Sequence, residues 1–382
     1  MIAQQLMECN GQSEYALYVK ALILRQDGRI LESLKNFQQA TRMEPHSAAN
    51  LKQVARSLYL LGKHKPAIDV YGEAKKISPE DWEIWHNEAL CCVYLKQYDR
   101  AADALRNANS IQRHDSTFMQ LGKVYTLQED YQAAIDVYQE ALEFSPDNSS
   151  ILTTIGLLYL RLGENFKAFE YLGNSLTHDP KSAKTILAAG SIIQDHQDMD
   201  VALIKYRVAV VETPNSAQLW NNIGMCFFGK QRYVAAIACL KKALYLDPFE
   251  WIISHNLGLV NLNSAQYASA FHYFSSSINL KADFPSSYLY LGITLSRLDD
   301  FENAVSAYQK AIDMESDHLF ELNFAITLCN NGDYDTAREH FLEFERLFQV
   351  LDSETKNSDA EVLEQRQSLS NMLLIDSVDP PA

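Results

Sequence analysis

The sequence predicts an all-α fold: a right-handed α-solenoid of about ten helix-turn-helix repeats. Three observations support this prediction, namely a 34-residue period, apolar residues at helical spacing within each period, and few turn-forming residues. Six of the ten prolines share one phase, and their successive separations are 34, 67, 34, 34 and 34 residues. These prolines are Pro45, Pro79, Pro146, Pro180, Pro214 and Pro248.

Small residues keep the same period. An alanine recurs through the chain with only two single-residue slips in ten units, and Ser33 stands in its place in the first unit. Agreement over so many units is not a chance event, so one structural unit is repeated. The alanines of this series are Ala67, Ala101, Ala134, Ala168, Ala202, Ala236, Ala270, Ala304 and Ala337.

Composition agrees with a helical protein and excludes some partners. Of 382 residues, 47% are hydrophobic, while only 14 are Gly and 10 are Pro, which disfavours a fold with many strands and turns. A net charge of −16 disfavours nucleic acid, because phosphate binding requires cations. No stretch is long and apolar enough to span a membrane, so we expect no direct membrane insertion. The six cysteines lack a disulfide-framework spacing and are expected to be reduced thiols of a cytoplasmic protein.

The stretch WNNIGMCFFGKQRYVAAIACL, residues 220–240, shows how one unit is built. Trp220, Gly224 and Phe227, with Ile223, have the spacing of one stripe on a first helix. Ala236 and Leu240 take the small and the bulky position of the second helix. Small residues are needed where two helices approach to about 8–10 Å, and bulky neighbours fill the remaining space.

This large-small pattern resembles the tetratricopeptide repeat (TPR), whose units stack because one hairpin cannot bury its apolar face alone. We assign residues 1–13 to a partial N-terminal helix and 14–351 to about ten repeats. Residues 352–382 are assigned to an acidic C-terminal tail with a possible capping helix. The chain contains no nucleotide-binding, metalloprotease or zinc motif, so we expect no catalytic residue, no cofactor and no metal.

Function is therefore expected on surfaces, and the first helices of TPR proteins line the binding groove. A basic stripe there would suit an acidic or phosphorylated peptide, or an acidic helix of another subunit; scattered solvated side chains are the alternative. Lys52 and Arg56 echo half of the carboxylate clamp of chaperone-binding TPR domains, but His86 and Leu90 stand where the clamp asparagines would be. The candidates are Tyr18, Lys52, Arg56, His86, Lys123, Arg161 and Lys184.

Two polar positions leave alternatives open. Asn222 and Asn256 share a repeat position with Asn87 and Asn323, and their amides could bind a peptide backbone or hydrogen-bond within the solenoid. Glu88 occupies a position that is apolar in most units. Its carboxylate either extends to solvent or meets a charge of a partner.

Particular units resemble one TPR family. They include NLKQVARSLYLLGKHKPAIDVYGEA from Asn50, ILTTIGLLYLRLGENFKAFEYLGNSLTHDP from Ile151, and LWNNIGMCFFGKQRYVAAIACLKKALYLDPFEW from Leu219. ILAAGSIIQDH from Ile186 and QYASAFHYFSSSINL from Gln266 add to the match. Together they resemble the Bardet–Biedl syndrome protein four family, the TPR subunits of the BBSome.

The resemblance implies a non-enzymatic scaffold in a coat-like complex that carries membrane-protein cargo to and from cilia. The expected partners are other BBSome subunits with TPR or β-propeller folds and, through the complex, ciliary cargo and an Arf-like GTPase. The expected location is the cytoplasm, the centrosome and centriolar satellites, the ciliary base and the cilium. A TPR chaperone adaptor that binds acidic C-terminal peptides is the alternative function.

Overall fold

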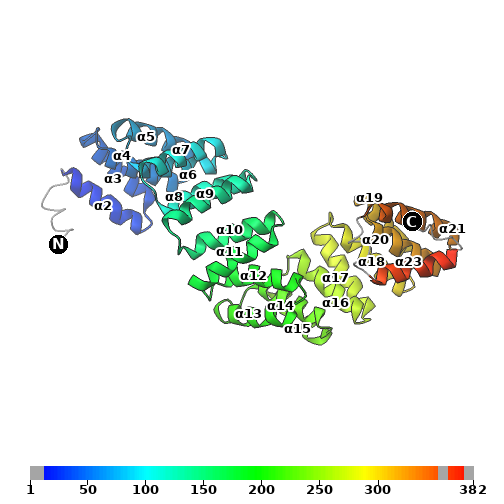
Figure 1. Ribbon diagram of the computed structural model, residues 1–382. Coiled ribbons are helices and arrows are strands. Elements are labelled where there is room, and N and C mark those ends of the chain that lie inside the picture. The colour runs from blue at the N-terminus through cyan, green and yellow to red at the C-terminus, as the bar shows by residue number, and fades with distance from the viewer. Residues whose placement is uncertain (1–12, 352–359, 374–382) are drawn as a thin grey trace. The chain divides into compact units, whose positions relative to one another are not determined.

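The computed structural model describes residues 13–351 and 360–373. Within these ranges the chain forms 21 helices and no strand. The helices from α2 to α21 follow one another as ten pairs, seen as successive hairpins in Figure 1. Every first helix has 13 residues. The predicted all-α solenoid of helix pairs is confirmed.

The chain divides into two compact units, residues 1–185 and 186–382. The first unit holds five pairs: α2 (Glu14–Gln26) with α3 (Ile30–Met43), α4 (Ala48–Leu60) with α5 (His64–Ile77), α6 (Trp82–Tyr94) with α7 (Tyr98–Ile111), α8 (Asp115–Leu127) with α9 (Tyr131–Phe144), and α10 (Ser149–Arg161) with α11 (Asn165–His178).

The second unit also holds five pairs, and its first helix begins just before the boundary. The pairs are α12 (Ala183–Asp195) with α13 (Met199–Glu212), α14 (Ala217–Gly229) with α15 (Tyr233–Leu246), α16 (Trp251–Asn263) with α17 (Tyr267–Leu280), α18 (Pro285–Arg297) with α19 (Phe301–Met314), and α20 (His318–Asn330) with α21 (Tyr334–Val350). Helix α23 (Ala360–Leu373) follows them.

Each pair turns through one residue with a positive φ angle. Glycine, which adopts this conformation without steric cost, occupies four of the ten turns. The other six turns use residues with a side chain, with φ between 56° and 65°. The turn residues are Gly28, Gly62, Lys96, Glu129, Gly163, Gln197, Gln231, Ala265, Asp299 and Gly332.

The connections between pairs explain the two slips of the period. Most connections have four residues, such as 78–81 between α5 and α6, where Asp81 accepts a hydrogen bond from the Glu83 amide and caps the helix. Only three residues join α7 to α8 and α19 to α20. These short connections begin with extended backbone at Gln112 and Glu315. The missing residue is therefore removed from a connection, and the helices keep their length.

Inside each pair, glycine lets a bulky side chain of the second helix approach the first. A Cβ added at Gly224 would lie 2.7 Å from Leu240 Cγ, and one at Gly122 would lie 2.3 Å from Tyr138 Cζ. Ala236 is fully buried beside this contact, and its carbonyl oxygen would lie 3.3 Å from a Cβ at position 224. The small-over-large arrangement thus sets the distance between the helices.

The remaining residues predicted to pack in the seventh pair lie at its margins. Trp220 and Phe227 are half-buried and pack against the apolar cluster that contains Ala236 and Leu240. The Trp220 indole donates to the Pro214 carbonyl at 2.8 Å, and Lys242 Nζ lies 3.6 Å from the centroid of its ring. These contacts join the α14–α15 pair to the connection that precedes it.

Helix α23 covers the end of the last pair. Val362, Leu369 and Leu373 belong to the same buried cluster as Phe344 and Phe348 of α21. Arg366 Nε also donates to Glu345 Oε1 at 2.5 Å. The partial helix predicted for residues 1–13 falls almost entirely outside the described residues, as do parts of the predicted tail, 352–359 and 374–382.

Candidate partner-binding surfaces

Among the described residues, four cysteines are buried, namely Cys91, Cys92, Cys226 and Cys329, and Cys239 is half-buried. Burial raises the pKa of Cys91 and of Cys226 to about 12, so both stay protonated at neutral pH and are poor nucleophiles. Within the described ranges, no group of three or more His, Cys, Asp and Glu side chains could hold a metal ion. None of the described helices combines the length and apolarity needed to cross a membrane.

Lys52 is already paired within the chain. Its Nζ lies 2.8 Å from Asp81 Oδ2 and 2.7 Å from Glu83 Oε2, both at the start of the next pair. Burial lowers the pKa of Lys52, but the hydrogen bonds to the two carboxylates outweigh that effect and raise it. Lys52 therefore carries no unpaired charge, and its contact with a partner stays a prediction. Sequence spacing missed this pairing because Asp81 and Glu83 belong to another pair.

His86 and Tyr18 are also engaged in packing. His86 Nδ1 lies 3.1 Å from Thr117 Oγ1 of the next first helix. Burial, followed by the charge of His114, lowers the pKa of His86, so the ring is neutral at physiological pH and adds no positive charge. Tyr18 packs edge-on against Phe37 at 5.4 Å between ring centroids. Two of the seven candidates thus stabilise their own solenoid.

The other four cations of the predicted stripe are exposed, and all belong to the first unit. Arg56, Lys123 and Lys184 make no ion pair with any described residue. The Arg161 guanidinium lies over the Tyr131 ring, 5.7 Å from its centroid, and also points a donor at the Tyr131 hydroxyl. These residues remain available to an acidic partner.

Arg25 of α2 adds a cation that the sequence analysis missed. Its Cζ lies 5.5 Å from the centroid of the Phe37 ring, and burial together with the positive charge of Arg56 lowers its pKa. Nη1 of Arg25 is buried without a hydrogen-bond partner among the described residues. Two neighbouring cations without a paired acid favour the approach of an anionic group. Arg25 and Arg56 lie on different helices, so helical periodicity alone does not bring them together.

The repeated asparagines hydrogen-bond within the solenoid. Asn256 Nδ2 donates to Asn221 Oδ1 at 2.9 Å, and Asn222 Nδ2 donates to the Tyr206 hydroxyl at 3.4 Å. Asn87 and Asn323 donate to backbone carbonyls of their own helices. Of the two alternatives left open by the sequence, the arrangement favours the internal one.

Glu88 follows neither of the alternatives expected for it. The residue is only 2% exposed and pairs with two cations of adjacent helices, Lys75 of α5 and Arg100 of α7, whose Nη2 lies 3.2 Å from Oε1. Lys75 Nζ also lies 4.3 Å from the centroid of the Trp85 ring. A buried acid needs such partners, and here the solenoid supplies them itself.

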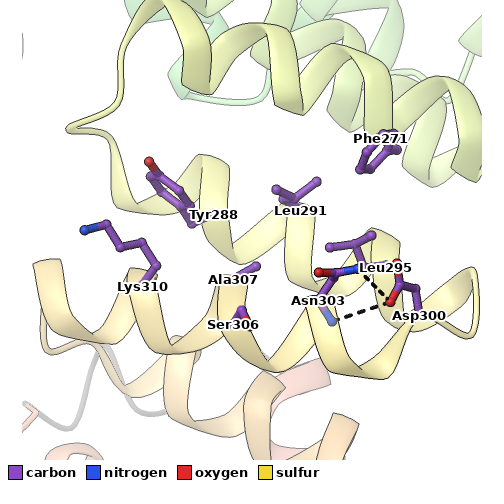
Figure 2. A pocket seen from close by; sticks show the side chains of 9 residues that line it. All are labelled: Phe271, Tyr288, Leu291, Leu295, Asp300, Asn303, Ser306, Ala307 and Lys310. Atoms are coloured by element: carbon purple, nitrogen blue, oxygen red, sulfur yellow. Dashed lines mark hydrogen bonds between the residues drawn. The ribbon is translucent and has the colours of Figure 1, made fainter.

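The second unit contains a groove of about 630 Å³ between α17, α18 and α19. Figure 2 shows Phe271 projecting toward Leu291 and Leu295, with Lys310 at the end near Tyr288 and Asp300 at the opposite end. Asp300 already accepts two bonds from the Asn303 amide, at 3.0 and 2.8 Å. The lining residues are Phe271, Tyr288, Leu291, Leu295, Asp300, Asn303, Ser306, Ala307 and Lys310.

The groove suits an apolar side chain of a partner better than a charged ligand. Its floor is formed by Leu291 and Leu295, whereas its only carboxylate is occupied by Asn303. A signal for it was present in the sequence. Ala307 stands one period after Tyr273, so a large side chain of the preceding pair is replaced by a methyl group.

Comparisons with known proteins identify the repeats. Tetratricopeptide-repeat models match residues 18–81, 217–249 and 285–318, and a further TPR-repeat model matches 122–163. Among solved structures, a TPR protein from Parabacteroides merdae covers 65% of this chain at a TM-score of 0.53 and 17% identity, and 99% of its own length is matched. The APC/C heterotetramer Cut9–Hcn1 covers 95% of this chain and 98% of the matched chain, at a TM-score of 0.52 and 11% identity. These likenesses show the fold alone.

Curated relatives decide the family. The protein named BBSome complex member BBS4 from Bos taurus is 50% identical over 377 residues, which are 98% of this chain and 73% of the relative. The chain belongs to the BBS4 family. The BBS4 homolog of Drosophila melanogaster is 34% identical over 351 residues, 87% of this chain and 72% of the relative. The resemblance of individual units to the BBS4 family is therefore confirmed.

Proposed function

We propose that the chain is a scaffold subunit of a BBSome, the coat-like complex of ciliary membrane-protein transport. The observation that carries the proposal is 50% identity to a named BBSome member across 98% of this chain. Identity of this extent covers all ten helix pairs, which supports a shared role for the whole solenoid. The solenoid serves this role by holding other subunits in place.

We further propose that the chain has no enzymatic activity of its own. The buried thiol of Cys226 is protonated, Asn256 donates to Asn221, and Glu88 pairs with Arg100. The relatives are named for membership of a complex. A binding role explains the exposed side chains of the described residues, and no catalytic role is needed for them.

The proposed partners are the other BBSome subunits, including those with TPR and β-propeller folds. Ciliary membrane-protein cargo and an Arf-like GTPase are proposed to meet this chain through the assembled complex. The proposed locations are the cytoplasm, the centrosome and centriolar satellites, the ciliary base and the cilium. No nucleic acid is proposed as a partner, because a net charge of −16 opposes binding to a phosphate backbone.

Within the first unit, the exposed cations Arg56, Lys123, Arg161 and Lys184, together with Arg25, are the proposed contacts for an acidic segment of a neighbouring subunit. Charge complementarity supports this assignment, because these side chains lack acids of their own. The chaperone-adaptor alternative is not favoured. Lys52, the cation it needs, is held by two carboxylates of the adjacent pair.

Co-expression with the other BBSome subunits tests the function. The tagged chain should co-purify with them in fixed proportion, as judged by size-exclusion chromatography and quantitative mass spectrometry. An Arg56→Glu/Lys123→Glu variant should lose part of this association. A matched Lys35→Glu/Lys65→Glu variant, which reverses exposed charges on second helices, should retain it. Elution of the unmodified chain apart from all other subunits would reject the proposal.

A further inference from the structure

The outer face of α13 carries an apolar stripe exposed to solvent. Val201, Ile204, Val208 and Val211 are 38%, 60%, 42% and 78% exposed. The opposite face of the helix is buried in the solenoid through Ala202, Leu203, Tyr206 and Ala209. Helix α13, drawn in green in Figure 1, is thus apolar on both faces. A helix at the surface of a soluble domain normally has one polar face.

The other second helices show that this stripe is exceptional. The positions equivalent to the stripe can be found in every pair by counting from the small residue that recurs with the period. This residue is Ala202 in α13 and Ala236 in α15. In the other nine pairs these positions hold polar, charged or small residues and Pro66, with Tyr245 as the one large apolar exception. For example, Ile204 corresponds to Asp136, Glu170 and His272. The repeat itself therefore does not require apolar residues here.

The spacing of the residues in the stripe indicates that the partner element is a helix. Successive members are three, four and three residues apart, which is the seam spacing of a coiled coil. Ten residues of helix rise separate the first member from the last, a length of about 15 Å. Nearly three turns of a partner helix can lie along this seam and insert aliphatic side chains between Ile204 and Val208.

Charged residues beside the stripe indicate the sign of the charge expected on the partner. Lys205 and Arg207 lie on opposite sides of it, both are exposed, and neither forms an ion pair with a described residue. The acid nearest the start of the stripe, Asp200, is paired with Lys230 of the next pair. The flanks of the central seam are therefore positive on a protein whose net charge is −16. Acidic residues on a partner helix would complement both flanks.

The same charges oppose pairing of two copies through this face. In a symmetric dimer the same patch of both copies meets, so Lys205 and Arg207 would face the Lys205 and Arg207 of the second copy. Like charges in such proximity disfavour association. A different polypeptide with acidic flanks meets no such repulsion.

We propose that the outer face of α13 binds an amphipathic helix of another polypeptide, one with an aliphatic seam and Glu or Asp residues beside it. This inference deepens the proposed scaffold function, on which it rests, by naming the kind of element that one surface holds. The partner helix covers Val201, Ile204, Val208 and Val211, and its acids pair with Lys205 and Arg207.

The test uses the full chain and a fluorescein-labelled synthetic peptide of about three heptads, with Leu at the seam positions and Glu at the flanking positions. A second peptide has Lys in place of each flanking Glu. Fluorescence anisotropy should show saturable binding of the Glu peptide and binding of the Lys peptide weaker by about tenfold or more. Higher salt should weaken the binding of the Glu peptide.

Two sets of variants locate the site. Ile204→Glu/Val208→Glu should reduce binding of the Glu peptide by about tenfold or more, because burial of a carboxylate in an apolar seam is costly. The control His272→Glu/Ser276→Glu changes the equivalent exposed positions of α17 and should bind as the unmodified chain does. Lys205→Glu/Arg207→Glu should reverse the preference between the two peptides. Circular dichroism of each variant establishes that it is folded.

Several outcomes would overturn the inference. They are equal binding of both peptides, Glu-peptide binding weaker than about 100 µM, and binding that survives Ile204→Glu/Val208→Glu. A dimer that this double variant dissociates would assign the face to a second copy. Co-sedimentation with phosphatidylcholine–phosphatidylserine vesicles that the same variant abolishes would assign it to a membrane. Because the peptide assay needs no other subunit, its failure would leave co-purification with the BBSome intact and reject this inference alone.

Discussion

Inward positions of the second helices hardly change from pair to pair, whereas outward positions two residues away change freely. Ala202 and Ala236, one period apart, are both fully buried. Two residues further along the helices stand Ile204 and Ala238, both exposed. An inward side chain must fit beneath another helix, so its size is fixed. An outward side chain meets only solvent or a partner. The fold is therefore encoded by the positions that repeat, and the partners by those that do not.

The largest effect is expected from a bulky substitution at an inward position. Ala236→Trp should lower the free energy of unfolding by about 3 kcal/mol, because the indole would have to enter the space between α14 and α15. Ala238→Trp, on the outward face of the same helix, should change it by less than about 0.5 kcal/mol. Urea unfolding followed by circular dichroism measures both. Similar costs for the two variants would remove the distinction between the faces.

A smaller effect concerns a buried histidine. His255 Nδ1 lies 2.9 Å from Ser287 Oγ, and burial lowers the pKa of His255 to about 4 from its ordinary 6.5. As pH falls below 6.5, the unfolded chain takes up a proton that the folded chain does not. The stabilisation from neutral His255 is therefore complete above pH 6.5 and declines as pH falls toward 4.

When pH falls from 7 to 5, this histidine should lower the free energy of unfolding of the unmodified chain by about 2 kcal/mol. His255→Gln should remove that contribution and flatten the pH dependence of urea unfolding. The exposed His272, an outward residue of α17, provides the control, and His272→Gln should leave the slope unchanged. Parallel pH profiles for His255→Gln and the unmodified chain would show that His255 is not held neutral by burial.

The smallest effect concerns the turns that join the two helices of each pair. Ala265 has φ 57°, a conformation that is costly for an L-residue with a side chain. Ala265→Gly should therefore raise the free energy of unfolding by about 0.5 to 1 kcal/mol. Ala238→Gly, within α15, should lower it by about 1 kcal/mol. Thermal unfolding of the two variants should shift in opposite directions, and shifts of the same sign would contradict the assigned turn.

The fold could be predicted from the sequence because its controlling contacts are local. Gly224, Ala236 and Leu240 lie within 17 residues of one another, and the same spacing recurs in pair after pair. Contacts of this kind require the same residue types at the same spacing in each pair, which makes the sequence periodic. The two slips of the period could be counted in advance as well, although only the structure shows that connections absorb them.

The candidate surfaces were less predictable because they depend on neighbouring pairs. The spacing of Lys52 and Arg56 is helical, but it contains no information about Asp81, which reaches Lys52 from the following pair. Arg25 lies close to Arg56 only when α2 and α4 are packed. The apolar residues of the α13 stripe are visible in the sequence, yet only their exposure in the folded chain separates them from core residues.

The helix pairs of each unit make their main contacts within themselves and with the adjoining pairs. Within the described residues no single core is shared by all the pairs, so one pair can unfold while others stay folded. Under mechanical load the chain should lengthen in steps, as one hairpin peels from the next while the rest stay folded. A subunit built in this way can absorb strain inside a moving assembly and recover its length when the force is removed.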